Sequence, residues 1–441
     1  MIQHLRRFLP KGLAGIMTAC CLVVAGCTTT AVNHSPAGGQ NSSPTIFFRQ
    51  ASCYCGGYLG TYQYNGHTHY ERFDSTTDNS YWEDGFINAQ GYSHDVLASI
   101  GAKAHLIRLN LYKNAIFVSD RQTGTGSNVY VPTGIAWAEA NPNHMDWFLT
   151  SDSPQGCVST CTPLAPDESN AIRSSSYSPY MLMDPGNVVY QNLWAGNVIA
   201  QLQRDGWDGV FVDDIFGDPG VHNLNPPKYN TRALWQSAVR SFLQNVASQI
   251  RAAGFIVIAN MNNNDGWEDW NTLVDGSMQE GWMRPTVSVA QAPITGANWM
   301  IQLNLAASNE NAGKYYQAMI PADADQNDDQ LVDSDQQAIL YGLTSAMLVN
   351  NGHVSVGISG YTSNNNAKYY EAIWGQEFDL ARQLGAPLGS YTTLGTYLYQ
   401  RNFQNGSVFV NADVVSHNID VNGASQALAA ASGVIVASPS P

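Results

Sequence analysis

The chain has 441 residues and a formal net charge of −15, from 35 acidic and 20 basic side chains. Charged residues make up only 12% of the chain and no basic patch is visible, which argues against nucleic acid as a partner. The 22 Tyr and 11 Trp suit an exported protein that handles neutral polyols, although a generic exported surface explains the same composition. The length fits two or three average domains, or one large barrel with insertions.

The first 26 residues have the features of an export signal. A positively charged start precedes a short apolar stretch, Gly12 to Val24, which is too short to span a bilayer as a mature helix. Val24-Ala25-Gly26-Cys27 resembles a bacterial lipobox, which implies cleavage before Cys27 and lipidation of its thiol. We therefore expect a lipid-anchored protein of the bacterial cell envelope, at the outer membrane or cell surface. Residues 27–44, rich in Thr, Ser, Asn, Gly and Pro, should be a flexible tether.

Four cysteines lie beyond Cys27. Cys157 and Cys161 stand in a loop rich in Ser, Thr and Pro, where a local disulfide fits an oxidising compartment. Cys53 and Cys55 are too close to bridge each other comfortably, so they either cross-link to the later pair or stay free. A zinc site is the weaker interpretation, because the pairs lack a matching His and a tight spacing.

Residues 45–390 alternate between strand-like and helix-like segments. The expected strands are Thr45–Gln50, His105–Tyr112, Asp146–Thr150, Gly209–Asp213, Phe255–Asn260, Gly276–Glu280, Tyr315–Ile320 and His353–Ile358. The expected helices are Asp95–Ile100, Gly186–Arg204, Leu234–Ile250 with Gly254 as its stop, Trp267–Leu273, Ala297–Ala307 and Asp335–Val349. Such alternation is typical of βαβ units, and about eight strands favour an α/β fold of the (β/α)8 TIM barrel type.

The tail, residues 391–441, has a different pattern. Gly395–Arg401, Gly406–Asn411 and Ser416–Val421 have the length and composition of short antiparallel strands. We expect a small C-terminal antiparallel β element that follows the barrel domain.

The most informative stretch is Asp208-Gly209-Val210-Phe211-Val212-Asp213-Asp214-Ile215. It predicts a short buried strand that ends in two adjacent carboxylates. In α/β barrels the carboxyl ends of the strands carry the chemistry. The alternative is a strand end whose carboxylates cap the next helix or lie in solvent.

Other polar residues follow the same scheme. Alternation places Asp213 on the face of Phe211, and Glu280, Asn260, Asn110 and Arg108 stand at or near the ends of their strands. Two carboxylates suit glycoside cleavage, in which one protonates the leaving oxygen while the other attacks carbon or activates water.

We assign Asp213 as nucleophile or base and Glu280 as general acid, with Asp214 orienting Asp213 or taking its place. Arg108, Asn110 and Asn260 are expected to bind substrate, and Trp282, two residues beyond Glu280, to line the sugar site and raise the pKa of that acid.

The order of several motifs resembles a known family. Met183-Asp184-Pro185-Gly186-Asn187, then the stretch around Asp213, IVIANMN, MQEGW and the late segment Arg401 to Gly406 look like hypothetical glycosyl hydrolase family 15. Endo-α-1,4-polygalactosaminidases are more distantly similar. The resemblance implies a barrel with an Asp after the fourth strand and a Glu after the sixth. The α-amylase clan has a similar DG-x-x-x-D run, but its Glu follows the fifth strand, where this chain has Asn260.

An acidic loop follows the strand that ends near Ile320. Asp323, Asp325, Asn327 and Asp329 alternate as in a calcium loop, but Asp328 replaces the usual Gly. A structural calcium is one interpretation. A solvated loop, or one whose Asp323 touches substrate, is the other. We expect no cofactor to be required.

Two functions of different classes follow. The first is a lipid-anchored glycoside hydrolase that acts on a polysaccharide or oligosaccharide outside the cytoplasm. The second is a non-catalytic carbohydrate-binding surface lipoprotein with a barrel fold, which would not need the carboxylate pair. The sugar, endo or exo action, and retention or inversion stay open at this point.

Overall fold

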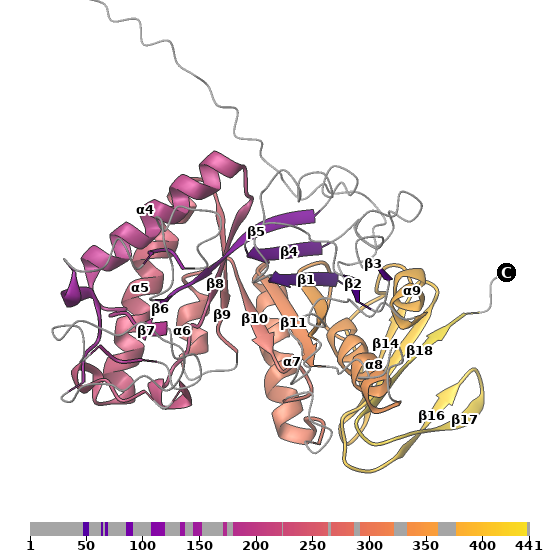
Figure 1. Cartoon of the computed structure of the whole chain (residues 1–441). Coiled ribbons are helices and arrows are strands. Elements are labelled where there is room, and N and C mark those ends of the chain that lie inside the picture. Colours follow the sequence, from indigo (N-terminus) through magenta and orange to yellow (C-terminus); the bar gives the residue numbers. More distant parts are fainter. Residues whose placement is uncertain are drawn as a thin grey trace, which may run out of the picture. The chain divides into compact units, whose positions relative to one another are not determined.

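The computed structural model describes residues 47–52, 63–64, 67–68, 85–90, 107–119, 133–136, 144–151, 171–173, 180–222, 224–262, 266–285, 292–321, 333–359 and 376–438. Residues Gly39–Pro441 group as one compact unit. Eight parallel strands of this unit pair in the order β1-β12-β11-β10-β9-β8-β5-β4, and the first pairs with the last (Figure 1). They are β1 (Phe47–Ser52), β4 (Gly85–Gln90), β5 (Ile107–Asn114), β8 (Gly209–Asp213), β9 (Ile256–Asn260), β10 (Gly276–Glu280), β11 (Tyr315–Pro321) and β12 (Val354–Ser359).

Helices follow the strands from β5 onward. They are α4 (Val188–Asp205), α5 (Arg232–Ala252), α6 (Trp267–Asn271), α7 (Gly296–Asn311), α8 (Asp333–Met347) and α9 (Gln376–Gln383). Asn187 begins α4 by accepting hydrogen bonds from the amides of Val189 and Tyr190, and Thr231 caps α5 in the same way. Gly254, with φ of 92°, follows the end of α5 as predicted. The prediction of an α/β fold with a parallel sheet is confirmed.

The apolar residues divide into two layers, as strand alternation requires. One face of the strands packs on the helices, and Val210, Val212 and Val257 are fully buried there. The other face forms a separate cluster of Phe211, Ile258, Met278 and Met319. Because Asp213 follows Phe211 by two residues, the same alternation sends its side chain to the inner face.

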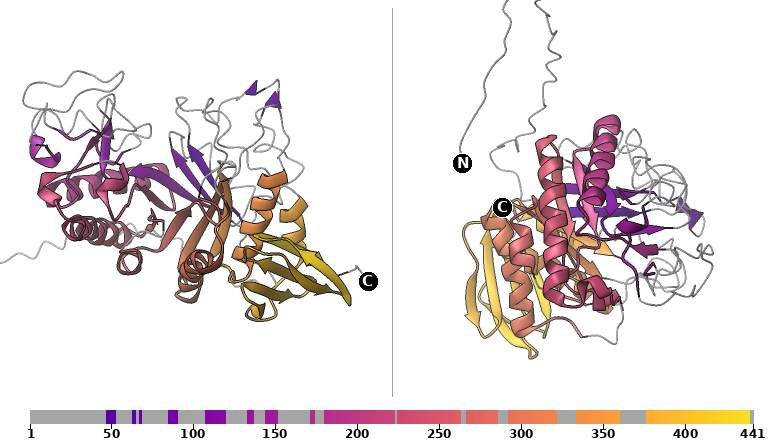
Figure 2. Two further views of the ribbon diagram at one scale, coloured as in Figure 1. Left: turned by 90° about the horizontal axis from the view of Figure 1, so that it is seen from below. Right: turned by 90° about the vertical axis from the view of Figure 1, so that its left-hand side faces the viewer.

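The last part of the chain forms antiparallel strands. They are β13 (Thr392–Gly395), β14 (Leu398–Phe403), β15 (Gly406–Asn411), β16 (His417–Val421), β17 (Ala424–Leu428) and β18 (Ser432–Ala437). The order β13-β14-β15-β18 makes one sheet, and β16 and β17 make a separate hairpin. The sheet, yellow in Figure 2, lies beside α8, with contacts from β15 and β18.

One predicted strand is absent from the sheet, and one strand of the sheet was not predicted. Asp146–Thr150 is not a strand of the sheet. The short 3-10 helix η2 (Met145–Trp147) begins there, and Phe148 and Thr150 make only single bridges, to Met183 and Ala171. Consecutive residues Trp147, Phe148 and Leu149 are all buried, so the run is apolar without alternating. The missing strand is β4, whose short apolar run within Gly85–Gln90 was overlooked.

Several predictions lie outside the described residues. They concern the signal and Cys27, the cysteines at 53, 55, 157 and 161, the helix at 95–100, and the acidic loop that contains Asp323, Asp325, Asn327 and Asp329. Among the described helices, none combines the length and hydropathy that a membrane span requires.

Arg401 of β14 ties the C-terminal sheet to the end of α8. Its side chain is buried, and its guanidinium donates to the carbonyls of Met347, Asn350 and Gly389 at 2.8–2.9 Å. It also donates to the side chain of Asn351. Burial lowers the pKa of Arg401 from its ordinary value. The late segment that resembles the family therefore has a structural role here.

We expect Arg401→Met to lower the free energy of unfolding by about 3 kcal/mol, because three buried carbonyl groups lose their donor. Urea denaturation at pH 7 measures this change. Gln400→Met is the matched control. Gln400 directly precedes Arg401, its side chain is only partly buried, and its amide donates to Asn402 alone. Equal stability of the two variants would contradict the role of Arg401.

Candidate active site

Three neighbouring strands end in polar residues that face the inside of the ring. Asp213 ends β8, Asn260 ends β9 and Glu280 ends β10, as the sequence predicted. In the pairing register Asn260 lies opposite Met278, so Glu280 stands two residues further toward the carboxyl edge. Parallel strands bring these ends to one mouth, because all of them point in the same direction.

Asp213 has a neutral donor on each carboxylate oxygen. Asn260 Nδ2 donates to Oδ1 at 2.9 Å, and the hydroxyl of Tyr112 donates to Oδ2. The Tyr112 ring packs against Phe211, with centroids 5.9 Å apart. The carboxylate is therefore held in one orientation from two neighbouring strands.

Glu280 stands beside this group at the mouth, where the residue as a whole is exposed while its carboxyl group is closely surrounded by protein. Burial of its carboxyl group, followed by the charge of Asp213, raises the pKa of Glu280 to about 7, and a hydrogen bond with Asn260 opposes the rise. The backbone amide of Glu280 donates to Asn262 Oδ1 at 2.6 Å. One amide side chain, Asn260, thus donates to Asp213 and also influences Glu280.

Asp214 adds a third carboxyl group to the cluster. It accepts a hydrogen bond from Asn114 Nδ2, while Asn114 Oδ1 accepts from the amides of Ile116 and Phe117 at 3.1 and 2.9 Å. Burial, and then the charge of Asp213, raise the pKa of Asp214 well above its ordinary value. The bond from Asn114 opposes this rise and the charge of Glu280 adds to it. Asp214 therefore keeps its proton more readily than an ordinary aspartic acid does.

The backbone is strained where these strands end. Asp214 has φ of 60°, Asn262 of 49° and Met283 of 58°, in the left-handed region that costs side chains other than Gly about 1–3 kcal/mol each. These residues follow β8, β9 and β10 in turn. Strain of this kind is typical of functional sites, where surrounding contacts maintain it.

The structure places the backbone of two predicted substrate-binding residues below the mouth. The strand that was expected to end at Tyr112 continues as β5 to Asn114. Asn110 is fully buried opposite Gly209, the first residue of β8, about 13 Å below Asn114 at roughly 3.3 Å per residue. Arg108 lies two residues lower still, paired with Phe86, and its side chain is outside the described set.

The residues that β5 brings to the mouth are Tyr112 and Asn114. They share the face of Asn110, so the alternation was predicted correctly while the end of the strand was not. A charged residue such as Lys113 often follows the end of a strand, yet Lys113 is fully buried within β5. Extending the same alternation by two steps would have identified both residues.

Trp282 is a core residue rather than a sugar platform. It is fully buried, its Nε1 donates to the carbonyl of Gly342 at 2.8 Å, and its ring meets Tyr316 edge-on. Stacking on a sugar requires an exposed ring face, so the predicted contact with substrate was wrong. The main causes of the raised pKa of Glu280 are burial and Asp213.

The predicted substrate and calcium ligands from Asp323 to Asp329 lie outside the described residues. Within the described ranges, no group of three or more His, Cys, Asp and Glu side chains has the arrangement of a metal site. The cluster that the structure does bring together is Tyr112, Asn114, Asp213, Asp214, Asn260 and Glu280.

Several solved structures are similar to this chain at low sequence identity. Amy13B from Eubacterium rectale has a TM-score of 0.50 at 8% identity, covering 91% of this chain and 97% of that one. The Nostoc punctiforme debranching enzyme has a TM-score of 0.46 at 13% identity, covering 91% and 100%. Aspergillus fumigatus Ega3, solved in complex with galactosamine, has a TM-score of 0.42 at 12% identity, covering 74% and 96%. No curated protein matches the sequence significantly.

The family comparison is more specific. Residues 109–407 match the profile of the hypothetical glycosyl hydrolase family 15, which is more than half of the chain. The matched range contains Asp213, Asn260 and Glu280, and extends through β14 to the start of β15. The suspected resemblance is confirmed, and the chain belongs to hypothetical glycosyl hydrolase family 15.

Proposed function

We propose that this protein is a glycoside hydrolase that cleaves a polysaccharide with two carboxylates, Asp213 as nucleophile and Glu280 as general acid and base. The observation that carries the proposal is Asn260 on β9, which donates to Asp213 of β8 on one side and lies next to Glu280 of β10 on the other. Membership of a glycosyl hydrolase family supports it. We further propose that the strands and helices belong to a complete (β/α)8 barrel, because the ring of eight parallel strands closes.

The shared amide favours a retaining mechanism. Asn260 Nδ2 donates to Asp213 Oδ1 at 2.9 Å and the same side chain also lowers the pKa of Glu280, so both carboxyl groups lie next to one amide. Retaining enzymes place their carboxyl groups about 5–5.5 Å apart, and inverting enzymes about 6.5–9.5 Å. The shorter separation leaves no room for a water between the nucleophile and the sugar.

The reaction then has two steps. In the first, an oxygen of Asp213 attacks the anomeric carbon while Glu280 gives its proton to the leaving oxygen, which leaves a glycosyl ester and an ionised Glu280. In the second, Glu280 takes a proton from water, and the resulting hydroxide releases the sugar and restores Asp213. Tyr112 and Asn260 keep Asp213 aimed during both steps, and a protonated Asp214 limits the negative charge around it.

The resemblance of the first 27 residues to a lipoprotein signal supports a location where polysaccharide is accessible. We propose that the lipidated Cys27 anchors the protein in the cell envelope and that residues 27–44 extend the catalytic domain from the membrane. The described residues do not include this segment.

Asp213→Asn and Glu280→Gln should each lower kcat at least about a hundredfold on any polysaccharide that the wild type cleaves, because each removes a group that acts on the reacting atoms. New reducing ends measure the rate across neutral and amino-sugar polysaccharides. Glu268→Gln, an exposed glutamate on α6, is the control.

Full activity of both variants would exclude the assigned pair. Binding of a glycan without cleavage by the wild type would favour the carbohydrate-binding alternative. NMR of the first anomer that is released tests retention: a product with inverted configuration contradicts the nucleophilic role of Asp213.

The pH dependence of kcat/KM should have an alkaline limb near pH 7. Glu280 must carry a proton to act as an acid, and its pKa of about 7 means that activity falls about tenfold per unit above that pH. Tyr112→Phe is the control, because Tyr112 contacts Asp213 and should leave this limb in place. A rate that stays constant to pH 9 would show that Glu280 is not the acid.

A test without substrate uses stability. Since folding raises the pKa of Glu280 from about 4.5 to about 7, the folded state binds the extra proton between these values. This contribution to stability is complete below pH 4.5 and is lost as the pH rises to 7. Glu280→Gln should therefore flatten the dependence of Tm on pH in this window, whereas Glu268→Gln should not. Parallel curves for wild type and Glu280→Gln would contradict the raised pKa.

A further inference from the structure

Asp184 is a buried carboxylate between two loops at the mouth, and the proposed two-step mechanism does not use it. It follows the strand β7 (Tyr180–Leu182) and stands just before α4, while its partners stand just before α5. In a βαβ unit each helix begins at the carboxyl edge of the strands, so both loops border the active site. Only 1% of Asp184 is exposed, which makes an uncompensated charge there costly.

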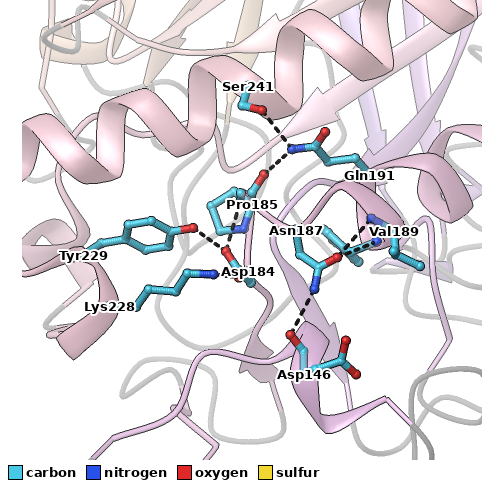
Figure 3. Close-up of polar contacts among 11 residues, drawn as sticks. Asp146, Asp184, Pro185, Asn187, Val189, Gln191, Lys228, Tyr229 and Ser241 are labelled. Carbon is cyan, nitrogen blue, oxygen red and sulfur yellow. Dashed lines mark hydrogen bonds and ion pairs between the residues drawn. The ribbon is translucent and has the colours of Figure 1, made fainter. Parts of the chain in front are cut away.

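Three donors converge on this carboxylate. Lys228 forms an ion pair with Oδ2, the hydroxyl of Tyr229 donates to Oδ1, and the amide of Gly186 donates to Oδ1 at 2.9 Å (Figure 3). Lys228 and Tyr229 belong to the short helix η4 (Pro227–Tyr229) in the loop that follows Asp214. Burial, and then the bond to Asp184, raise the pKa of Tyr229, so its hydroxyl remains a donor.

Gly186 shows how closely the two loops approach. A Cβ atom at this position would lie 2.3 Å from the hydroxyl of Tyr229, so only glycine fits without displacing it. The Asp184 loop is also held on its other side, because the backbone amide of Asp184 donates to the carbonyl of Trp147 at 2.7 Å. Asn187 Nδ2 bonds the carbonyl of Asp146 at 3.0 Å (Figure 3).

Aromatic rings connect the contact between Asp184 and Tyr229 with the turn at Asp213 and Asp214. Tyr229 meets Trp235 edge-on at 5.8 Å, and Trp235 stacks on Phe216 at 5.3 Å. Trp235 Nε1 also donates to the carbonyl of Phe216 at 2.7 Å. Phe216 is two residues beyond Asp214, whose left-handed backbone needs support from its surroundings.

The same rings reach the second support of Asp214. Phe216 packs on Phe117 with centroids 6.5 Å apart, and the amide of Phe117 donates to Asn114 Oδ1. Asn114 in turn donates to Asp214. Two routes of contact therefore lead from Asp184 to Asp214. One runs through Phe216, in the loop that follows Asp214, and the other runs on through Phe117 to Asn114 of β5.

We propose that Asp184, Lys228 and Tyr229 form a latch between the two loops that positions the Asp213–Asp214 turn for catalysis. These are positioning residues, because none of them contacts the carboxylates that are assigned to the reaction. This inference rests on the proposed hydrolase function for its effect on rate. Its effect on the loop is independent of that function.

The latch can be opened without removing core side chains. In the full chain, Lys228→Met removes the charge of a side chain that is 58% exposed, and Tyr229→Phe removes one hydroxyl. Arg240→Met is the matched control. It breaks an exposed ion pair with Asp269 that lies outside residues 214–222 and involves neither Asp184 nor its partners.

Hydrogen exchange of residues 214–222 is the first measurement. Exchange should become at least about tenfold faster in Lys228→Met and Tyr229→Phe, and should remain at the wild-type rate in Arg240→Met. The double variant Asp184→Asn with Lys228→Met should be no faster than either single variant, because all of them open one contact. Unchanged exchange in the two latch variants would overturn the proposal.

Turnover on the polysaccharide identified by the screen is the second measurement. The latch variants should lose about tenfold in kcat with KM within twofold of the wild type, since the turn is displaced while substrate still binds. Faster exchange with unchanged kcat would mean that the contact is only structural, and would overturn the positioning role. If the wild type cleaves nothing, the hydrolase proposal fails, and the exchange rates still decide whether the latch holds the loop.

Discussion

The candidate active site depends on holding three acidic side chains close together although their negative charges repel one another. Asp213, Asp214 and Glu280 repel one another when ionised, and burial together with the charge of Asp213 raises the pKa of Asp214 and of Glu280. Asn260 and Tyr112 donate to Asp213, and Asn114 donates to Asp214. These contacts support the proposed roles, in which Glu280 gives the proton and Asp213 attacks.

This arrangement is supported by elements that have no direct part in the reaction. The left-handed residues after β8, β9 and β10 are maintained by hydrogen bonds and packing around them, such as the bond between Asn262 and the amide of Glu280. The proposed latch at Asp184 gives the family motif Met183–Asn187 a physical role. In this proposal the motif stabilises the contact between two loops rather than binding substrate. Arg401 has the corresponding role for the C-terminal sheet.

Much of the sheet was predictable because buried strands have a clear apolar signature. The runs that became β8 and β10 matched their strands residue for residue, and β9 began one residue later than expected. Asp146–Thr150 misled for the same reason, because its apolar residues are buried by loop packing and not by pairing in the sheet. Trp282 shows a similar limit: an aromatic ring near an acid has the same local sequence whether it faces a sugar or the core.

The sequence by itself determined which carboxylates end neighbouring strands and which face they share, because alternation along a strand is a local property. It also determined the order of motifs that identifies the family. Tertiary structure alone decided that β5 extends to Asn114, and so replaced Arg108 and Asn110 with Tyr112 and Asn114 at the mouth. Register, burial and proton affinity arise from contacts between residues a hundred positions apart, which no local pattern of residues encodes.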